Sequence, residues 1–490
     1  MIGIHDVVVS ASKRHRTEQE RQMAKVTAVG AHFYQALIAF GLLLIVSRLL
    51  ETADYTAYSF FISVNQFAAV LCFEWIRSAA QRFYPGPNAQ SEATQRHVLT
   101  MEFGFCAVSC LGAAMVLPAF GVAWVTALTG GMAAIFLAGS DIHLTMIRFR
   151  QQFRLLSRLQ ALRATLLAAT TLLGLAIDRC FEGAALGLVA GYMIYAVAAA
   201  VISKRHASAQ GQWSAEAARE HLVYGGVTAS SATINMLAPL GLKTILTVLL
   251  GPQQAAGALL ALDLLQRPFV LIFAALYAIQ FPEVVALYDR EGAGPAMRGQ
   301  LGRYYALMTS ASFMMAAGTF SILRPVGAWL IAPDLQHGFL EAAPFVIVAA
   351  LTRALSQNML PTASQLRRHL LSIFLLAVMD CELVNVLALA SASAFGPSNT
   401  SIMAGAAAGA LLATGYGLVI VVALPFEMLW GSVIFSIAGC AVSTAAFAVP
   451  FQNIYVSAAI AIAGGGCFCL MSLTRVVDLL RMPATATKSV

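Results

Sequence analysis

Residues 182–203 read EGAALGLVAGYMIYAVAAAVIS, a run of 22 residues whose only charge, Glu182, stands at its first position. A helix rises about 1.5 Å per residue, so a run of this length can cross a hydrocarbon layer of about 30 Å. The rest of the chain has a similar composition, since 59% of its 490 residues are hydrophobic and 11% are charged, against about 25% charged in soluble domains. The sequence therefore predicts an all-α, polytopic membrane protein.

Apolar segments of membrane length recur along the chain, and fourteen are predicted as transmembrane helices. The third and fourth are separated by LPAFG (117–121), a Pro and Gly pair that interrupts a continuous apolar run. The predicted spans cover residues 26–50, 56–84, 98–118, 121–146, 156–177, 182–203, 222–250, 256–288, 301–323, 339–362, 370–394, 402–424, 428–450 and 454–476.

Basic residues support this count, because Lys and Arg stay on the cytoplasmic side in short loops. They gather in the amino-terminal segment, in nearly every second connection after it and in the carboxyl-terminal tail, whereas Arg48, Arg179 and Arg324 fall on the opposite side. Both termini are therefore predicted to be cytoplasmic, and residues 1–25 read as the start of a retained signal anchor because no cleavage signal follows them.

A weak internal repeat divides the chain into two halves. GAALGLVAGY (183–192) opens the sixth span and GAAAGALLATGY (405–416) opens the twelfth, six spans later. Six is even, so the copies would have the same orientation and form parallel repeats. The predicted organisation is a cytoplasmic segment 1–25, a first lobe 26–203, a linker 204–221, a second lobe 222–424, two further spans in 428–476 and a cytoplasmic tail 477–490.

Composition also argues against several functions. The net charge of +7 is explained by loops that face anionic lipid headgroups, so no nucleic-acid partner is expected. The cysteines lie in apolar segments without His or carboxylates at ligand spacing, so neither a metal site nor a cofactor is expected. The sequence GxxxxGK[ST] does not occur, which argues against an ATP-driven pump.

Polar side chains follow one face of the second span. At 100° per residue they fall within an arc of about 80°, and ionisable residues inside a span usually face a bundle interior or an aqueous cavity. Glu74 and Arg77, at i and i+3, can neutralise each other. The stripe consists of Ser59, Ser63, Gln66, Glu74, Arg77 and Gln81.

Other predicted spans carry buried polarity as well. Asp263 and Arg267 repeat the acid–arginine spacing at i and i+4 in the eighth span. Because cations predominate, the interior is predicted to be basic and to favour an anionic cargo. Structural ion pairs at Arg77 and Arg267, and snorkelling at Arg163, Lys243 and Arg353, remain open alternatives. The remaining members are Lys243 with Asn235, Arg163, Arg353 with Gln357 and Asn358, and the acids Glu102, Asp141, Asp380 and Glu382.

Three stretches carry a family resemblance: SRLLETADYTAYSF (47–60), the arginine-rich MIRFRQQFRLLSRLQALRATLLAA (146–169) and YGGVTASSATINMLAPLGLKTILTVLLGPQQAAGALLAL (224–262). With the two predicted halves and two extra spans, the chain resembles the oligosaccharide flippases (polysaccharide transporter, Wzx-like) of the multidrug/oligosaccharidyl-lipid/polysaccharide exporter superfamily. It departs from that family at Ala57, where glycine is frequent, and at Lys243, where many members carry other polar groups.

The resemblance implies that the protein is not an enzyme but moves an undecaprenyl-pyrophosphate-linked oligosaccharide across a bacterial inner membrane by alternating access. The implied partners are this lipid-linked oligosaccharide, membrane lipids, a polysaccharide polymerase and chain-length proteins. Glu74 and Asp263 would hold the arginines and exchange protons. The cations expected to attract the pyrophosphate or acidic sugars are Arg77, Arg267, Lys243, Arg163 and Arg353.

Two other functions remain open from the sequence. A cation-coupled multidrug exporter would share the fold, but an acidic binding region would suit its cationic cargo better. A membrane polysaccharide polymerase or glycosyltransferase would need a long outer loop with paired carboxylates, whereas the longest predicted outer connection, about 324–338, offers APDLQH (332–337).

Overall fold

The computed structural model describes residues 27, 30–31, 33–86, 88–203, 211–367, 369–421, 424–449 and 454–481. The predicted segment 1–25, residues 204–210 of the predicted linker and residues 482–490 of the predicted tail lie outside the described residues. Within those ranges every regular element is helical.

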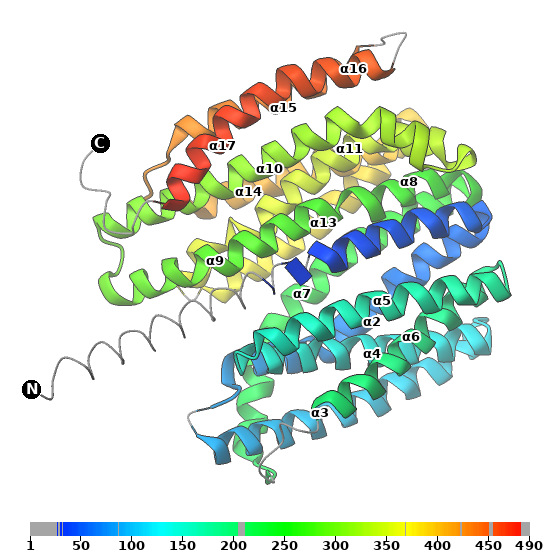
Figure 1. The fold of residues 1–490 in the computed structure, drawn as a ribbon, viewed down its shortest axis with the longest axis vertical. Helices are drawn as coiled ribbons and strands as arrows, with labels where there is room; N and C mark the ends of the chain where they lie inside the picture. Colours follow the sequence, from blue (N-terminus) through cyan, green and yellow to red (C-terminus); the bar gives the residue numbers. More distant parts are fainter. Residues whose placement is uncertain are drawn as a thin grey trace, which may run out of the picture. The chain divides into compact units, whose positions relative to one another are not determined.

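Thirteen helices in the described ranges are long and apolar enough to cross a membrane, and the apolar helix Phe33–Leu49 corresponds to the first predicted span. The predicted all-α polytopic membrane fold is confirmed, and each of the fourteen predicted segments coincides with one helix or with two or three consecutive helical elements (Figure 1). The further elements are α2 (Thr52–Phe83), α3 (Ala89–Val116), η1 (Leu117–Phe120), α4 (Trp124–Phe149), α5 (Phe153–Ile177), α6 (Phe181–Ser203), α7 (Ala215–Leu250), α8 (Pro252–Leu265), α9 (Arg267–Glu291), α10 (Pro295–Leu330), α11 (Pro333–Asn358), α12 (Pro361–Leu366), α13 (Leu370–Phe395), α14 (Asn399–Val421), α15 (Trp430–Ala448), α16 (Ile454–Ile460), the π-helical turn η3 (Ala461–Gly465) and α17 (Gly466–Arg481).

The predicted break between the third and fourth spans is confirmed. Helix α3 ends at Val116, the short 3-10 helix η1 follows, and Gly121 takes a left-handed conformation with φ +88° before α4 begins. Glycine adopts this conformation without the steric penalty of a Cβ atom, so LPAFG ends one helix and redirects the chain into the next.

The eighth predicted span is wrong in one detail, because it is not a single helix. It divides at Gln266 into α8 and α9. Pro268 lies at the start of α9, and its ring nitrogen cannot donate the hydrogen bond that would continue α8. As a result, Asp263 and Arg267 belong to two consecutive helices.

The chain forms two compact units. Among the described residues, unit 1 contains those from 27 to 42 and from 68 to 229, and unit 2 contains those from 43 to 67 and from 230 to 481. Helices α2 and α7 each contribute residues to both units. The two lobes predicted from the sequence, 26–203 and 222–424, stay a prediction.

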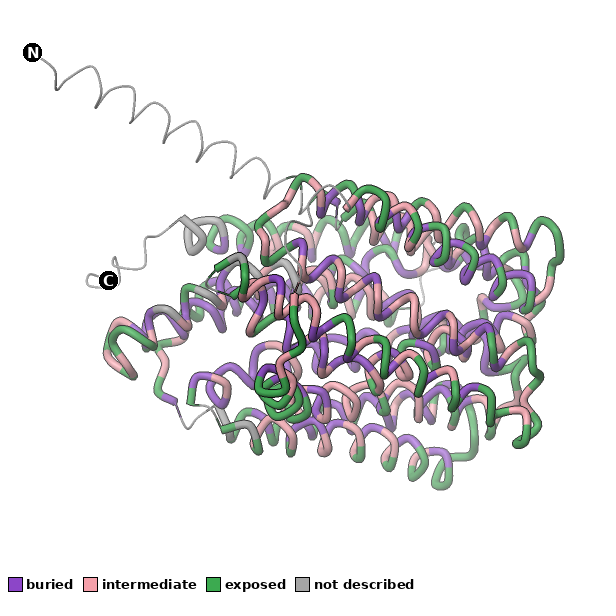
Figure 2. Tube along the Cα trace, turned by 90° about the horizontal axis from the view of Figure 1, so that it is seen from below, coloured by how far each residue is buried: buried purple, intermediate pink, exposed green. Residues whose placement is uncertain are grey.

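Burial alternates with exposure along the helices, as Figure 2 shows in purple and green. The exposed positions of α3 include Phe105 and Val108, each 74% exposed. Large apolar side chains on the outside of a helix fit lipid as the surrounding solvent.

Both copies of the predicted repeat pack closely on the preceding helix. In unit 1, a Cβ atom on Gly187 of α6 would lie 2.3 Å from the carbonyl oxygen of Thr170 on α5. In unit 2, a Cβ atom on Gly409 of α14 would lie 2.3 Å from the carbonyl oxygen of Leu383 on α13. Glycine lets these backbones approach closely, which explains the Gly and Ala patterns at both places.

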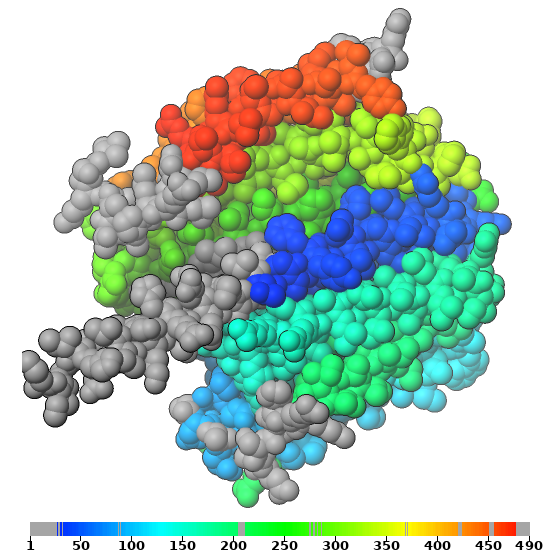
Figure 3. Space-filling view, in the orientation of Figure 1, coloured from blue at the N-terminus to red at the C-terminus, as the bar shows by residue number. Residues whose placement is uncertain are grey.

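The carboxyl-terminal helices α15–α17 belong to unit 2 and lie along α10 (Figure 3). Two serine pairs join α10 to α15: the hydroxyl oxygens of Ser310 and Ser432 are 3.1 Å apart, and those of Ser321 and Ser443 are 3.2 Å apart. Buried hydroxyl pairs of this kind are common between transmembrane helices.

Candidate functional site

In unit 1, the predicted pair on α2 is formed. The Arg77 guanidinium donates through Nε to Glu74 Oε2 at 2.6 Å and through Nη2 to Glu74 Oε1 at 2.5 Å. Two parallel hydrogen bonds make this a bidentate ion pair. The Arg77 side chain is nevertheless 41% exposed, against 11% for Glu74, so part of the guanidinium remains accessible.

A second ion pair in unit 1 joins α4 to α5. Arg163 Nη1 donates to Asp141 Oδ1 at 2.5 Å and to Ser140 Oγ at 2.8 Å. The Arg163 side chain is 10% exposed and that of Asp141 is 40% exposed. The arginine is thus buried and partnered, and its carboxylate is the more accessible member.

Arg148 lies between the predicted spans 121–146 and 156–177, so the sequence predicts it to be in a cytoplasmic connection. The structure places it on the last turn of α4, where its charge interacts with those of Arg77 and Asp141. Among the residues that the structure describes, no carboxylate pairs with Arg148. The signal that could have revealed it is its helical spacing of seven residues from Asp141.

Outside the spans, side-chain contacts join the connection after α2 to the carboxyl-terminal end of α4. The Tyr84 hydroxyl donates to Glu92 Oε1 at 2.6 Å, and the Arg150 guanidinium pairs with the same carboxylate. Burial, followed by the hydrogen bond to Glu92, raises the pKa of Tyr84 above its usual value. The phenol therefore stays protonated and can act as a donor at neutral pH.

In unit 2, Lys243 lies at the centre of a closed network with α2 and α8. Its ammonium donates to Asp263 Oδ1 at 2.6 Å, Ser63 Oγ at 2.7 Å and Ser59 Oγ at 2.8 Å. The hydroxyls of Ser59 and Tyr55 donate to Asp263 Oδ2 at 2.5 and 3.4 Å. Since an ammonium has three N–H donors, Lys243 is saturated, and its side chain is only 4% exposed.

The predicted pairing of Asp263 with Arg267 is not formed. The Asp263 carboxylate binds Lys243, and Arg267 Nε donates instead to the main-chain oxygen of Asp263 at 3.0 Å. This bond satisfies a carbonyl at the end of α8, where helices leave such groups unpaired. Over the described ranges no carboxylate pairs with Arg267, so its guanidinium is anchored but not neutralised.

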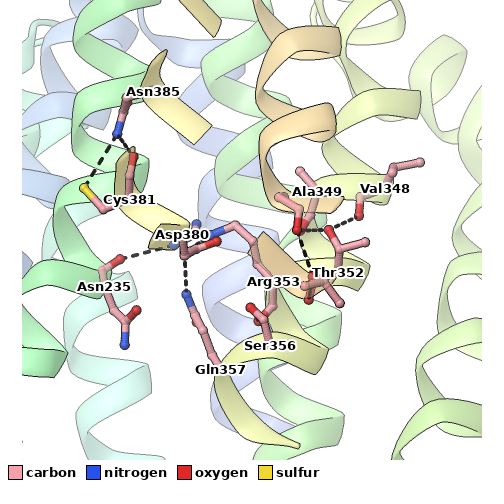
Figure 4. Close-up of polar contacts among 12 residues, drawn as sticks. Asn235, Val348, Ala349, Thr352, Arg353, Ser356, Gln357, Asp380, Cys381 and Asn385 are labelled. Atoms are coloured by element: carbon pink, nitrogen blue, oxygen red, sulfur yellow. Dashed lines mark hydrogen bonds and ion pairs between the residues drawn. The ribbon is translucent and has the colours of Figure 1, made fainter. Parts of the chain in front are cut away.

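A third group in unit 2 joins α7, α11 and α13 (Figure 4). Arg353 Nε donates to Asp380 Oδ2 at 2.9 Å, and its Nη2 donates to the main-chain oxygen of Asn235 at 3.2 Å. Gln357 Nε2 donates to the same Asp380 oxygen at 3.3 Å. The side chains of Arg353 and Asp380 are 11% and 1% exposed, which makes this a buried structural ion pair.

The sequence interpretation missed His221, which it placed at the end of the linker. His221 lies on α7 in unit 1 and contacts Glu102 on α3, with Nδ1 and Oε2 3.0 Å apart. Its other ring nitrogen, Nε2, is 2.6 Å from Gln95 Oε1. Neither the polar stripe nor the loop charges could reveal this pair, because its two members are 119 residues apart.

Taken together, the five predicted cations differ in how far their charge is neutralised. Lys243, Arg163 and Arg353 are buried and bound to carboxylates. Arg77 is paired but accessible, and Arg267 is half-buried with no carboxylate partner in the described structure. Whether these cations line a substrate path stays a prediction.

Comparisons with known proteins agree on the fold. No protein-family model and no curated protein matches the sequence, whereas several solved structures match the fold. These neighbours are transporters of the multidrug/oligosaccharidyl-lipid/polysaccharide (MOP) superfamily, and the chain has their fold.

Three of these structures illustrate the range. The lipid II flippase MurJ in an inward closed conformation superimposes with a TM-score of 0.67 at 10% identity, covering 93% of this chain and all of MurJ. An outward-facing multidrug resistance MATE family transporter superimposes with a TM-score of 0.59 at 14% identity, covering 82% of this chain and 96% of its own. A MOP superfamily transporter from Pyrococcus furiosus with a binding pocket of reverse polarity gives 0.55 at 12% identity, with 82% and 96% covered.

Proposed function

We propose that the protein is a flippase for a lipid-linked oligosaccharide carried on undecaprenyl pyrophosphate, acting in the synthesis of a bacterial surface polysaccharide. The observation that carries this proposal is the match to a lipid II flippase over 93% of the chain and 100% of that protein. The MATE match covers 82% of the chain. The flippase therefore accounts for more of the helices, which supports a lipid-linked cargo over a free drug.

The charge of the intramembrane residues also supports an anionic headgroup. Arg267 has its Nε fixed on a main-chain oxygen, which leaves its terminal nitrogens with no carboxylate partner in the described ranges. An arginine so oriented can give two parallel hydrogen bonds to a phosphate. Arg77 is the second candidate, because its guanidinium is accessible beside Glu74.

The other three predicted cations have a different proposed role. Lys243, Arg163 and Arg353 each join two or more helices while bound to a buried or half-buried acid. Removing one member of such a pair leaves a charge in a low dielectric, which is strongly unfavourable. We assign these pairs to holding each unit together, and we treat Arg267 of unit 2 and Arg77 of unit 1 as two separate candidates for binding a phosphate group.

A cation-coupled multidrug exporter remains the second candidate, because the MATE transporter shares the fold. Cationic cargo would be repelled by an arginine without a counter-ion. In unit 1, Arg148 adds a further positive charge, with which no carboxylate of the described residues forms an ion pair. This electrostatic argument favours the flippase.

Deleting the gene in its host tests the proposal. The expected result is loss of surface polysaccharide, with complete repeat units accumulating on their lipid carrier in the inner membrane. Chemical analysis of those units would then identify the cargo. Normal polysaccharide together with new sensitivity to cationic drugs would overturn the flippase and favour the exporter.

Complementation of that deletion tests the assigned residues. Arg267→Ala and Arg77→Ala remove hydrogen bonds to a charged group, each bond contributing about 2 kcal/mol or roughly thirtyfold in affinity. Export should therefore fall at normal protein abundance. The matched control is Arg290→Ala, at the other end of α9, where the side chain is 68% exposed and pairs with Glu291. Wild-type export with both test variants would refute the site.

A further inference from the structure

Unit 1 contains a buried histidine held between two acceptors on one helix. Glu102 and Gln95 are seven residues apart on α3, which places them two turns apart on the same face. His221 of α7 lies between them, with Nδ1 3.0 Å from Glu102 Oε2 and Nε2 2.6 Å from Gln95 Oε1. Nothing in the proposed pyrophosphate site uses these residues.

The group is shielded from water. His221 is 0% exposed and Glu102 is 7% exposed. Phe83, the last residue of α2, stacks on the imidazole at 5.4 Å, and Tyr224 packs edge-on against Phe83 at 5.7 Å. In the part of the chain that the structure describes, no Lys or Arg pairs with Glu102, so His221 is its charge partner.

This arrangement satisfies both ring nitrogens when the imidazole is protonated. The imidazolium donates Nδ1–H to Glu102 and Nε2–H to Gln95, and its charge cancels that of the carboxylate. A neutral ring has a single N–H, so the Gln95 amide would have to rotate to donate to the other nitrogen. The Glu102 carboxylate would then remain buried and uncompensated, which is unfavourable in a low dielectric.

The surroundings add few competing ionisable groups. On α3, the ionisable Cys106 lies one helical turn from Glu102. On α2 the facing side chain is the aromatic Phe83, and on α7 Tyr224 contacts that ring. Arg219 and Glu220, which precede His221, are exposed. Glu102 and His221 are therefore the two ionisable side chains that contact each other in this group.

His221 lies on α7, a helix that contributes residues to both compact units. Residues of α7 up to 229 belong to unit 1, and those from 230 on belong to unit 2, including Lys243. We propose that Glu102 and His221 bind the proton that drives the transport cycle, so that its release weakens the hold of α3 on α7. The proposal rests on the transport function proposed above and names its coupling ion.

The first experiment measures the proton directly and does not need a cargo. Infrared difference spectra of the full-length protein in lipid vesicles are recorded between about pH 5 and about pH 8, the range in which His titrates. The test variant is the double substitution Glu102→Gln with His221→Gln, because it leaves no unpaired buried charge and keeps side chains that can hydrogen-bond. Loss of one carboxylate and one imidazole contribution from the wild-type spectrum is expected.

A matched control is His337→Gln, since His337 also pairs with a glutamate, Glu341, but its side chain is 85% exposed. The His337 variant should lose an imidazole contribution but keep the Glu102 carboxylate band. A double variant with the same carboxylate bands as the wild type would overturn the proposed proton site, whatever the protein transports.

The second experiment tests coupling in cells that lack the chromosomal gene. Dissipating the proton gradient with an uncoupler should reduce wild-type polysaccharide export, and the double variant should show export that no longer responds to the uncoupler. If the wild type supports export but both proteins respond equally, the coupling proposal fails while the flippase stands. If deletion leaves export unchanged, the flippase itself fails, and the infrared result alone decides whether the proton site exists.

Discussion

Replacing Lys243 by methionine should destabilise unit 2, because it leaves Asp263 without its cation. The ammonium lies 2.6 Å from the carboxylate, and the two side chains are 4% and 17% exposed. Removing one member of a buried pair costs about 3–5 kcal/mol. We expect about 3 kcal/mol, the lower end, since the hydroxyls of Ser59 and Tyr55 still donate to Asp263.

The double variant Lys243→Met with Asp263→Leu distinguishes a paired effect from two separate ones. Replacing both members of a buried ion pair by apolar residues of similar volume is often neutral or stabilising. The hydroxyls of Ser59 and Ser63 lose partners at about 1 kcal/mol each. The double variant should therefore lie within about 2 kcal/mol of the wild type, far from the sum of the single effects.

The assay is unfolding of the purified full-length protein in detergent, followed by circular dichroism for the wild type, both single variants and the double. Ser63→Ala serves as a graded control, because it removes one of the hydrogen bonds to Lys243 and should cost about 1 kcal/mol. If the double variant loses as much as both single variants added together, Lys243 and Asp263 do not act as a pair, and the reasoning from their geometry is refuted.

Two further predictions concern packing and topology. Gly409→Ala places a Cβ atom 2.3 Å from a carbonyl oxygen of α13 and should lower the free energy of unfolding by about 1–3 kcal/mol. Gly415→Ala on the same helix is the control and should not lower it, because no atom lies within 4 Å of the added Cβ. Equal unfolding midpoints for the two variants would contradict the close packing. Cys180 lies between α5 and α6, and a hydrogen bond to Asp178 raises the pKa of its thiol. In a variant whose single cysteine is Cys180, a membrane-impermeant maleimide should label intact cells faster as pH rises, and Asp178→Asn should increase the rate near neutral pH by lowering that pKa. An unchanged rate with Asp178→Asn would refute the effect of the carboxylate, and labelling only after lysis would refute the predicted outer location.

The sequence predicts contacts within one helix better than contacts between helices. Glu74 and Arg77 are three residues apart on α2, and helix geometry alone brings them together. The same argument failed for Asp263 and Arg267, because Pro268 interrupts the helix and the carboxylate binds Lys243 of α7 instead. A local pattern cannot anticipate a partner that tertiary packing brings closer.

Most of the ion pairs that the sequence does not predict join residues far apart in the chain. Arg353 and Asp380 are 27 residues apart and meet only because α11 lies near α13. The hydrophobic pattern predicts how many segments are long enough to cross a membrane, since each needs about 20 apolar residues. It does not fix which polar faces meet, because lipid-facing and buried positions are both apolar and periodicity distinguishes them poorly.

Ion pairs neutralise most of the cations in the interior that the sequence predicts to be basic. In unit 2, the carboxylate of Asp263 pairs with Lys243 and not with Arg267, which leaves one positive charge at the start of α9. In unit 1, the acids Glu74 and Asp141 offset Arg77 and Arg163 but not Arg148. Among these residues each unit therefore has an excess of one cation, while the ion pairs keep the helices within a unit in register. Because an arginine without a counter-ion inside a membrane is unfavourable in the absence of a ligand, Arg267 is the position at which a bound phosphate would gain most.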